Sequence, residues 1–322
     1  MITRDLPAFA HAFHAAPAAA PPCPKAVFLV SPEGFALASE SASDNVYMDL
    51  QRRVDGERAL HQHRELHRAL AATMPTICFA GDPATPDAVF PNNVFATVGS
   101  AEPTAGSAAP TAGSAQPAAP GRVLIAHMRH PVRQREAERG DIRGFFTATL
   151  GYELHDLRGQ PGVGELTGSL VIDRARRIGF CGLSERCDEA GAAAMHAAFD
   201  LRASLLFDLA PGEYHSNVVL SVLAGRAVSI CPDGFADPAV AAAIAALYPH
   251  AVVLDTDERR AFAGNCIAPT PDKVWMSQTA ADALRPGSRA GFAAAGFALC
   301  AVALDEIEKA GGSLRCCVGE IY

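Results

Sequence analysis

One pattern constrains the fold of this chain more than any other: small or polar residues recur within apolar, strand-like segments about every 50 residues, once a low-complexity insert is subtracted. Intervals of this size, each with strand and helix signals, predict a closed array of repeated α/β units. The five segments are Phe90-Pro91-Asn92-Asn93-Val94-Phe95, Leu166-Thr167-Gly168-Ser169-Leu170-Val171, Tyr214-His215-Ser216-Asn217-Val218-Val219, Phe262-Ala263-Gly264-Asn265-Cys266-Ile267 and Leu314-Arg315-Cys316-Cys317-Val318. Equivalent positions would converge on a central axis and bring together Asn93, Glu165, His215, Asn265 and Cys316.

The composition argues against nucleic-acid and membrane partners. The chain has 322 residues and a net charge of −8, and its arginines form no basic stripe. The N-terminal residues lack the apolar core of a leader, and no apolar run reaches the roughly 18 residues of a membrane helix, so we expect a cytoplasmic protein. Nine cysteines without C-x-x-C pairs argue against both a disulfide framework and a structural zinc site.

The chain is expected to hold a loose N-terminal arm, residues 1–24, and a single domain, residues 25–322. Residues 101–121 repeat Pro-Thr-Ala-Gly-Ser-Ala, which cannot bury a core face, so we interpret them as a flexible loop within a hairpin. A helix over 46–72 is expected to begin at Asp44 as its N-cap. The other expected helices are 131–150, 185–209, 237–247, 278–284 and 303–310, and the expected strands include 26–30, 94–98, 123–126 and the terminal 314–322.

Two weaker motifs are set aside. His63 and His67 lie four residues apart on the expected helix, but no third ligand is nearby and no glutamate is placed as in H-E-x-x-H, so we interpret them as a solvated helix face. Gly162, Gly164 and Gly168 miss the G-x-G-x-x-G spacing by one residue, which argues against dinucleotide binding.

Five motifs stand in order at the repeat positions: Asp87-Ala88-Val89-Phe90-Pro91-Asn92-Asn93, Glu165-Leu166-Thr167-Gly168-Ser169, Tyr214-His215-Ser216-Asn217-Val218, Phe262-Ala263-Gly264-Asn265 and Gly311-Gly312-Ser313-Leu314-Arg315-Cys316. Together they resemble the guanidine-modifying, or pentein, superfamily, and most of all its amidinotransferase-like branch called citrulline utilisation hydrolases. The resemblance covers residues 26–322 and implies a five-bladed, pseudo-symmetric α/β propeller with a catalytic centre on its axis. Leu166 and Ser31 depart from the branch, where glycine and arginine are usual.

The resemblance implies that Cys316, His215 and Glu165 are catalytic, and the residue types suit this chemistry. A thiolate can attack the central carbon of a guanidino or ureido group and form a covalent adduct. An imidazole can protonate the departing amine and then deprotonate the resolving water, which predicts a bell-shaped rate profile near neutrality. A carboxylate can orient the imidazole. The resemblance implies no metal and no organic cofactor, and it assigns substrate binding to Asp87, Asn92, Asn93, Asn217, Asn265 and Arg315.

Two adjacent cysteines compete for the role of nucleophile. If residues 314–322 form a strand, Cys316 and Cys317 point to opposite faces and only one of them reaches the axis. The motif G-G-S-x-R-C assigns this role to Cys316. Taken alone, either cysteine would more often be a small buried core residue.

Asn93 and Asn217 favour a neutral substrate. Arginine deiminases carry aspartates at the positions that these residues resemble, and two carboxylates pair well with a guanidinium. Amides suit a ureido group, because they offer both a donor and an acceptor, so we predict conversion of citrulline to ornithine, ammonia and carbon dioxide. Arginine dihydrolase, arginine deiminase and dimethylarginine hydrolase activities are the enzymatic alternatives, and a catalytically silent binding module is the other. The expected partner is a small amino acid, and a homo-oligomer is left open.

Overall fold

The structure is a computed structural model that describes residues 1–100 and 119–322, so most of the predicted 101–121 loop lies outside the described residues. The described residues form a mixed α/β fold with five small, separate sheets. The sheets are, in strand order, β16 (Gly319–Ile321), β2 (Ala26–Val30) and β3 (Thr76–Phe79); β4 (Phe95–Val98), β5 (Arg122–Ile125) and β6 (Glu153–Asp156); β1 (Ile2–Thr3), β9 (Ala203–Asp208), β8 (Ile178–Leu183) and β7 (Leu170–Asp173); β10 (Leu220–Leu223), β11 (Ala227–Ile230) and β12 (His250–Val253); and β13 (Ile267–Thr270), β14 (Lys273–Ser277) and β15 (Ala298–Val302).

All five sheets share one pairing scheme. An inner strand pairs antiparallel with the second strand, and the second pairs parallel with the third. In the first sheet the inner strand is β16, which comes from the far end of the chain and places Gly319 opposite Phe28 of β2. Inner strands of neighbouring sheets are in contact, as β16 is with β4 and β10 is with both β7 and β13. The predicted repetition of α/β units is therefore present in the pairing itself.

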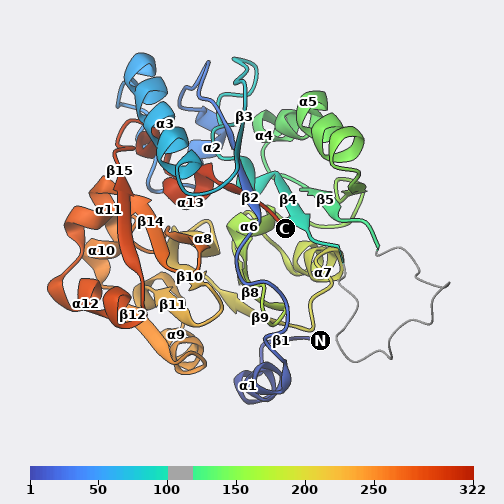
Figure 1. Ribbon diagram of the computed structural model, residues 1–322, viewed down its shortest axis with the longest axis vertical. Helices are drawn as coiled ribbons and strands as arrows, with labels where there is room; N and C mark the ends of the chain where they lie inside the picture. The colour runs from blue at the N-terminus through green and yellow to red at the C-terminus, as the bar shows by residue number, and fades with distance from the viewer. Residues whose placement is uncertain (101–118) are drawn as a thin grey trace.

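Helical crossovers join the parallel strands of each sheet, since parallel neighbours cannot be connected by a tight turn. Longer helices such as α3, α9 and α12 lie on the outside of the molecule (Figure 1). The crossover elements are α3 (Gly56–Ala71); α4 (Pro131–Gln134), η2 (Arg135–Glu138), α5 (Gly140–Gly144) and the π-helix η3 (Phe145–Thr149); α7 (Glu189–Ala198); α9 (Pro238–Ala246); and α11 (Gln278–Ala283) with α12 (Pro286–Ala294). The remaining short elements are α2 (Ser39–Ala42), η4 (Pro232–Gly234), α10 (Thr256–Arg260) and η5 (Ile307–Ala310).

Of the six expected helices, two are confirmed and four differ from the structure. Asp237 and Ser277 cap α9 and α11, close to the predicted starts. The helix expected over 46–72 begins only at Gly56, because Asp55 is the N-cap and its side chain accepts the Arg58 N–H at 3.1 Å. Residues 185–209 contain α7 and then strand β9, where an alanine-rich helix gives way to an apolar run. Residues 131–150 are helical in four short pieces, and 303–310 hold only the 3-10 turn η5.

The recurring polar segments are single helical turns rather than strands. Four of them, η1 (Pro91–Asn93), α6 (Leu166–Ser169), α8 (Ser216–Val219) and α13 (Leu314–Cys317), lead at once into the inner strands β4, β7, β10 and β16. The expectation of one strand over 314–322 is therefore wrong for its first half, where the Cys316 N–H closes a turn on the Ser313 carbonyl at 3.0 Å. In Figure 1, α6, α8 and α13 lie near the centre of the molecule.

The N-terminal residues are not a loose arm. Strand β1 extends the third sheet by pairing in parallel with β9, and α1 (Leu6–Ala15) begins at Asp5, its N-cap. Phe9 and Phe13 of α1 are buried and meet Phe180 and Tyr248 edge to face. The prediction of a loose arm rested on the many alanines and prolines of this segment. It overlooked Phe9 and Phe13, which lie four residues apart on one face of the helix.

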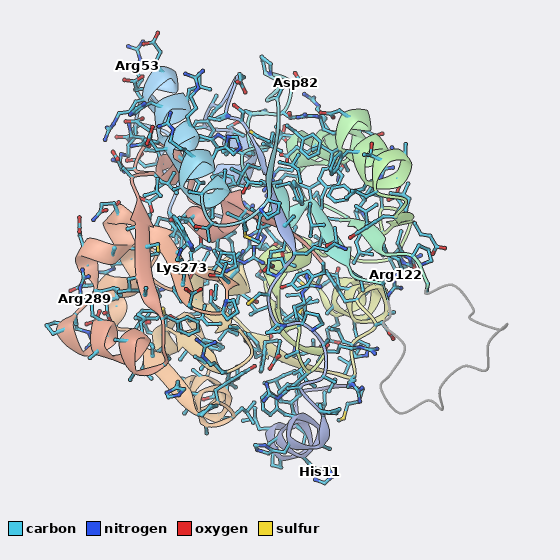
Figure 2. All side chains as sticks on the ribbon, in the orientation of Figure 1. His11, Arg53, Asp82, Arg122, Lys273 and Arg289 are labelled. Carbon is cyan, nitrogen blue, oxygen red and sulfur yellow. The ribbon has the colours of Figure 1, made fainter. Side chains whose placement is uncertain are left out.

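We expect Phe9→Ala to lower the free energy of unfolding by about 3–5 kcal/mol, because it removes a fully buried aromatic ring and leaves a cavity. Urea unfolding followed by circular dichroism measures this change. His11→Ala is the matched control, since His11 is exposed on the outer side of α1 (Figure 2). A loss below about 1 kcal/mol for Phe9→Ala would show that α1 is not part of the cooperative core.

Candidate active site

The structure brings the repeat-position residues together in the interior. Asn93 ends η1, Glu165 and His215 directly precede α6 and α8, Asn265 precedes β13, and Cys316 lies in α13. All five are buried. Each stands just before the inner strand of its unit, so the repetition of the fold, rather than any local sequence, places them near one another.

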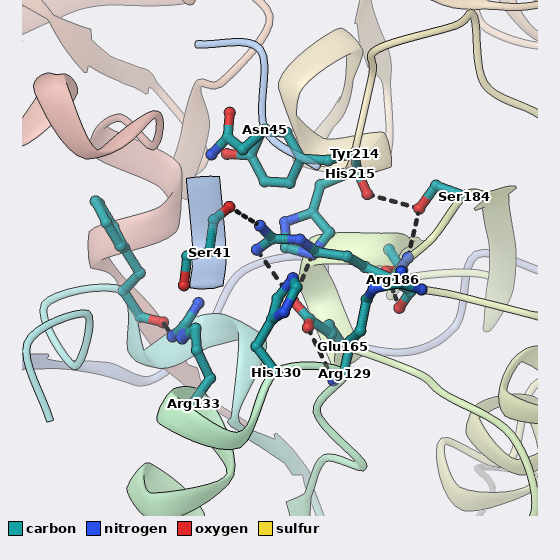
Figure 3. Close-up of polar contacts among 12 residues, drawn as sticks. Ser41, Asn45, Arg129, His130, Arg133, Glu165, Ser184, Arg186, Tyr214 and His215 are labelled. Atoms are coloured by element: carbon teal, nitrogen blue, oxygen red, sulfur yellow. Dashed lines mark hydrogen bonds and ion pairs between the residues drawn. The ribbon is translucent and has the colours of Figure 1, made fainter. Parts of the chain in front are cut away.

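Glu165 and His215 form a buried pair at the centre of this group. The Nε2 atom of His215 lies 2.8 Å from Oε2 of Glu165, and neither side chain is exposed. A neutral imidazole in this position donates its Nε2 proton to the carboxylate, which leaves Nδ1 as the acceptor. Among the described residues Nδ1 has no hydrogen-bond partner. Figure 3 shows the pair next to Arg186.

The charge of Glu165 is stabilised by its neighbours. Burial alone would raise the pKa of Glu165, but the Arg186 guanidinium, the hydrogen bond with His215 and the more distant Arg133 lower it to about 2. Nη1 of Arg186 lies 3.7 Å from Oε2 of Glu165, and the Arg129 backbone N–H donates to Oε1 at 3.2 Å. Burial lowers the pKa of His215 although Glu165 opposes this shift, so the resting pair is a carboxylate beside a neutral imidazole.

Cys316 faces the interior beside two amides. Its Sγ accepts from Nδ2 of Asn265 at 3.3 Å and lies 3.8 Å from Oδ1 of Asn217. Burial raises the pKa of Cys316, while its contacts with Ser313 and Asn265 oppose the increase. The resting sulfur is therefore a thiol. Cys317 is also buried, and burial raises its pKa further. The two cysteines lie in one helical turn, so the expected alternation of strand side chains does not explain why Cys316 lines the cavity and Cys317 does not.

A cavity of about 270 Å³ opens beside Cys316. Three of its lining residues belong to the segment 39–48, which contains α2. This segment was not predicted as part of the site, because residues 46–55 were expected to belong to a helix. The buried residues Arg133 and Arg186 were not predicted either, because charged residues are normally exposed. The lining residues are Ser41, Asn45, Met48, Asp87, Phe90, Asn93, Arg133, Arg186, Tyr214, Ala310, Gly312 and Cys316.

Asp87 presents an unpartnered oxygen among the lining residues. Its Oδ2 accepts a hydrogen bond from the Ser41 hydroxyl at 2.6 Å. Its Oδ1 is buried and has no hydrogen-bond partner among the described residues. Burial raises the pKa of Asp87, and the Arg133 guanidinium opposes this only in part. A buried carboxylate oxygen in this state is a ready acceptor for a cationic N–H group.

Asn93 and His215 lie on either side of Gly168. A side-chain Cβ at Gly168 would come within 2.6 Å of Asn93 Oδ1 and 2.9 Å of His215 Nδ1, so only glycine leaves room for both groups. Asn93 Oδ1 also has no partner among the described residues. The neighbouring Asn92 is buried but does not line the cavity, and its backbone oxygen accepts from the Thr167 hydroxyl at 3.0 Å.

Not every predicted substrate-binding residue reaches this cavity. Asn217 and Asn265 contact the Cys316 sulfur but do not line the cavity. Asn217 donates to the Thr167 carbonyl at 3.1 Å. Arg315 does not line the cavity either: its guanidinium donates to Glu320 at 2.8 Å and to the Val318 carbonyl at 2.9 Å, and its role in substrate binding stays a prediction. Arg315 and Asn217 instead line a second cavity of about 530 Å³.

One of the two histidines of α3 differs from the interpretation as a solvated face, since His67 is partly exposed and His63 is not. His63 is buried, and burial lowers its pKa to about 4. Its Nε2 has no hydrogen-bond partner among the described residues. In the described ranges no group of three or more His, Cys, Asp and Glu side chains could hold a metal ion. The same ranges contain no helix long and apolar enough to cross a membrane.

Comparison with known proteins gives related family and structural matches. A family model described as "N,N dimethylarginine dimethylhydrolase, eukaryotic" matches residues 31–322. The N(G),N(G)-dimethylarginine dimethylaminohydrolase of Mycobacterium tuberculosis is 28% identical over 205 residues, which are 62% of this chain and 61% of that protein. The match thus spans about three fifths of the length of this curated relative.

Solved structures share the fold at low sequence identity. The substrate-bound N-terminal domain of ArgZ, an arginine dihydrolase from the ornithine-ammonia cycle in cyanobacteria, has a TM-score of 0.74 at 19% identity and covers 92% of this chain and 97% of its own. The enzyme DDAH from Pseudomonas aeruginosa, in complex with citrulline, has a TM-score of 0.66 at 17% identity, covering 92% and 99%. These likenesses establish the mixed α/β fold of the pentein structures.

Proposed function

The chain belongs to the N,N-dimethylarginine dimethylhydrolase family of the pentein superfamily, and we propose that it is a cysteine-dependent hydrolase that cleaves a C–N bond of a guanidino group. The predicted superfamily is confirmed, and the family's relatives act on guanidino compounds by name. We further propose that the five sheets are the five blades of a propeller with Cys316, His215 and Glu165 on its axis. The observation that carries the proposed function is a cavity lined by the Cys316 thiol, by Asn93 and by Asp87 with its unpartnered carboxylate oxygen. The Glu165-bound imidazole of His215 lies next to Asn93 at Gly168.

The proposed reaction begins with a thiol and a neutral imidazole. The Cys316 thiol loses its proton as its sulfur bonds to the guanidino carbon, and the bond from that carbon to one terminal nitrogen breaks. His215 carries the proton to the departing nitrogen, so that an amine or ammonia leaves. A water then adds to the carbon of the thiouronium, and His215 takes one of its protons. The C–S bond breaks as the carbonyl of the ureido product forms, the remaining hydroxyl proton passes to the sulfur to restore the thiol, and His215 releases its extra proton to solvent. Glu165 holds the imidazole and stabilises its cation throughout.

The ureido substrate citrulline is the second candidate. This substrate was predicted from the amides of Asn93 and Asn217. Of these two residues, Asn93 lines the cavity beside Cys316, whereas Asn217 contacts the sulfur and does not line the cavity. The Asp87 carboxylate supplies a negative charge for a substrate guanidinium, which the two amides cannot supply. We therefore rank a guanidino substrate above citrulline.

The proposed activity is tested by incubating the protein with L-arginine, asymmetric dimethylarginine, agmatine and citrulline and identifying the products by mass spectrometry. Stopping the reaction with acid should also trap an added mass on the peptide that contains Cys316. Turnover of citrulline with no turnover of a guanidino compound would replace the proposal by the ureido reaction. No product and no adduct from any compound would support the catalytically silent binding module.

We expect Asp87→Asn to lower kcat/KM for the preferred guanidino compound about a hundredfold, because the variant removes the charge that faces the substrate cation. Any citrulline turnover should change much less, since a ureido group is neutral. Steady-state kinetics with both compounds measure the split. Ser41→Ala is the matched control, as it removes the hydrogen bond to Asp87 and keeps the carboxylate. An equal loss on both substrates would show that Asp87 acts only through the structure.

A further inference from the structure

Asn265 contacts the helical turn that carries the proposed nucleophile at three points. Its Nδ2 donates to Sγ of Cys316 at 3.3 Å, and its Oδ1 accepts the Cys316 backbone N–H at 3.4 Å. Its own carbonyl accepts the Arg315 N–H at 3.4 Å. Asn265 and Cys316 are both buried, so these contacts are shielded from bulk solvent. A single residue thus holds both the sulfur and the backbone of α13.

The surroundings of Asn265 decide which end of its amide faces the sulfur. Nδ2 also donates to the Asn217 backbone carbonyl at 2.8 Å. If the amide were reversed, its oxygen would lie against that carbonyl oxygen, and the two acceptors would repel each other. The donor end of Asn265 therefore points to Sγ of Cys316. The side chain of Asn217 is placed the other way, because its Nδ2 donates to the Thr167 carbonyl and its Oδ1 lies 3.8 Å from the sulfur.

The segment that carries Asn265 is held from both sides. The Ser221 hydroxyl lies 2.8 Å from the carbonyl oxygens of both flanking residues, Gly264 and Cys266. An added Cβ at Gly264 would come within 2.4 Å of the Val218 carbonyl oxygen, so only glycine lets this segment approach α8 so closely. These contacts fix the amide before any substrate binds. Such preorganisation is what a donor to a developing negative charge requires.

An N–H donor at this place favours the charged form of the sulfur. Burial raises the pKa of Cys316, and the contacts with Ser313 and Asn265 oppose this rise. The charges of Arg315 and Arg133 act in the same direction to a lesser extent. A hydrogen bond to a thiolate is stronger than one to a thiol, so the donor stabilises the charge as it develops. The titratable side chains that share the cavity with the sulfur are Asp87, Arg133, Arg186 and Tyr214, and those that flank it in α13 are Arg315 and Cys317.

We propose that Asn265 activates Cys316 and does not bind the substrate, an assignment that rests on the proposed covalent reaction at this sulfur. Its Nδ2–H group donates to the sulfur while the thiol gives its proton to His215 and the C–S bond forms. Its Oδ1 holds α13 in place, and the amide keeps its own protons throughout. Asn265 was expected to bind the substrate, but it does not line the cavity beside Cys316. It is a catalytic residue that contacts the nucleophile instead of the substrate.

The first test measures how fast iodoacetamide alkylates Cys316 in the full chain at a series of pH values, by mass spectrometry of the peptide that contains it. Fragmentation distinguishes Cys316 from Cys317, and the exposed Cys78 reports the reagent in every sample. Asn265→Asp should slow alkylation at about pH 8 by about tenfold or more, because the carboxyl ionises before the thiol and its charge then opposes the thiolate. Asn265→Ala removes the donor without adding a charge, so its rate should lie between those of Asn265→Asp and the parent.

The order of these rates separates activation of the sulfur from packing. A structural role predicts that Asn265→Ala is the more perturbed variant, since alanine leaves a cavity and aspartate keeps the shape of asparagine. Ser221→Ala is the matched control, because it weakens the support of Asn265 and keeps the amide. It should stay within about threefold of the parent. A reversed order, equal rates or an equal loss for Ser221→Ala would overturn the inference. If Asn265→Asp does not fold, the comparison of Asn265→Ala with Ser221→Ala decides.

The second test measures turnover of the preferred guanidino compound by Asn265→Ala. We expect kcat to fall about a hundredfold while KM stays within about threefold, because the lost donor acts on the sulfur and not on the substrate. The basic limb of the pH profile should move to higher pH, since the thiol becomes harder to ionise. A rise in KM at unchanged kcat would return Asn265 to substrate binding and leave the proposed hydrolase intact.

The two readouts distinguish failure of this inference from failure of the proposed function. Alkylation does not depend on turnover, so a parent that hydrolyses none of the compounds would count against the hydrolase, while the order of alkylation rates still decides the role of Asn265. If iodoacetamide does not label Cys316 in the parent, the shift of the basic limb decides. A parent with neither labelling nor turnover would overturn both.

Discussion

Cys316→Ala is expected to reduce turnover of the preferred guanidino compound by about four orders of magnitude or more, because Cys316 is the one thiol among the described residues that line the cavity. Cys317→Ala should stay within about tenfold of the parent, since the Cys317 side chain packs in the hydrophobic core with Leu314 and Val318 and does not line the cavity. Product formation by mass spectrometry over hours gives the range needed to measure both variants.

The comparison needs a check on folding, because both cysteines are buried. Circular dichroism and the urea midpoint of each variant separate a lost nucleophile from a lost fold. The folded Cys316→Ala variant should still bind the substrate, and calorimetry measures this binding. An active Cys316→Ala together with an inactive but folded Cys317→Ala would reverse the assignment of the nucleophile.

The second large effect concerns pH, because the proposed reaction transfers a proton from Cys316 to His215. The active form holds one proton between a thiol and an imidazole, so activity falls when a second proton binds or the last one leaves. Burial lowers the pKa of His215 below its usual 6.5 and raises that of Cys316 above its usual 9.0. We therefore expect log kcat/KM to be flat from about pH 6.5 to about pH 9 and to fall on either side. The bell near neutrality expected from the residue types becomes a broad plateau.

Glu165→Gln should lower kcat by about three to four orders of magnitude, because the amide no longer holds the imidazole in the required tautomer. The acidic limb of the profile should also move to lower pH, since Glu165 normally raises the pKa of His215 against its burial. Glu258→Gln is the control: Glu258 is equally buried but bonds Arg285 and caps α10. A loss of rate without any shift of the acidic limb would make Glu165 a structural residue only.

The repeat-position residues could be found from sequence because each stands at the same place in a repeated unit. The spacing predicts that Glu165, His215 and Cys316 lie near one another, and the 2.8 Å contact between Glu165 and His215 confirms this for the first two. Local conformation was harder: residues 314–317 were expected to be extended, yet backbone bonds from Cys316 and Cys317 to Ser313 close a turn. A one-turn helix of four residues has too few positions to show a period of 3.6.

The charged lining of the cavity could not be predicted for a different reason. Arg133, Arg186 and Asp44 are ordinary polar residues in the sequence, and Asp44 had the appearance of a helix N-cap. Their burial depends on partners that lie far away in the chain, as in the pairing of Arg186 with Asp44. No local sequence pattern encodes such a pairing. The charge of the preferred substrate therefore depends on a set of lining residues that only the folded structure brings together.

The pairing of β16 with β2 has a consequence for biosynthesis. The strand that follows Cys316 completes a sheet whose other two strands leave the ribosome almost the whole chain earlier. Until then the edge of β2 is unpaired, and its apolar residues offer a template for intermolecular association. The nucleophile is seated only when this long-range contact closes, and contacts of such sequence separation form slowly. In a nascent chain Cys316 therefore reaches its final position after most of the other strands have been made. Until then the unpaired edge of β2 needs protection from association with other chains.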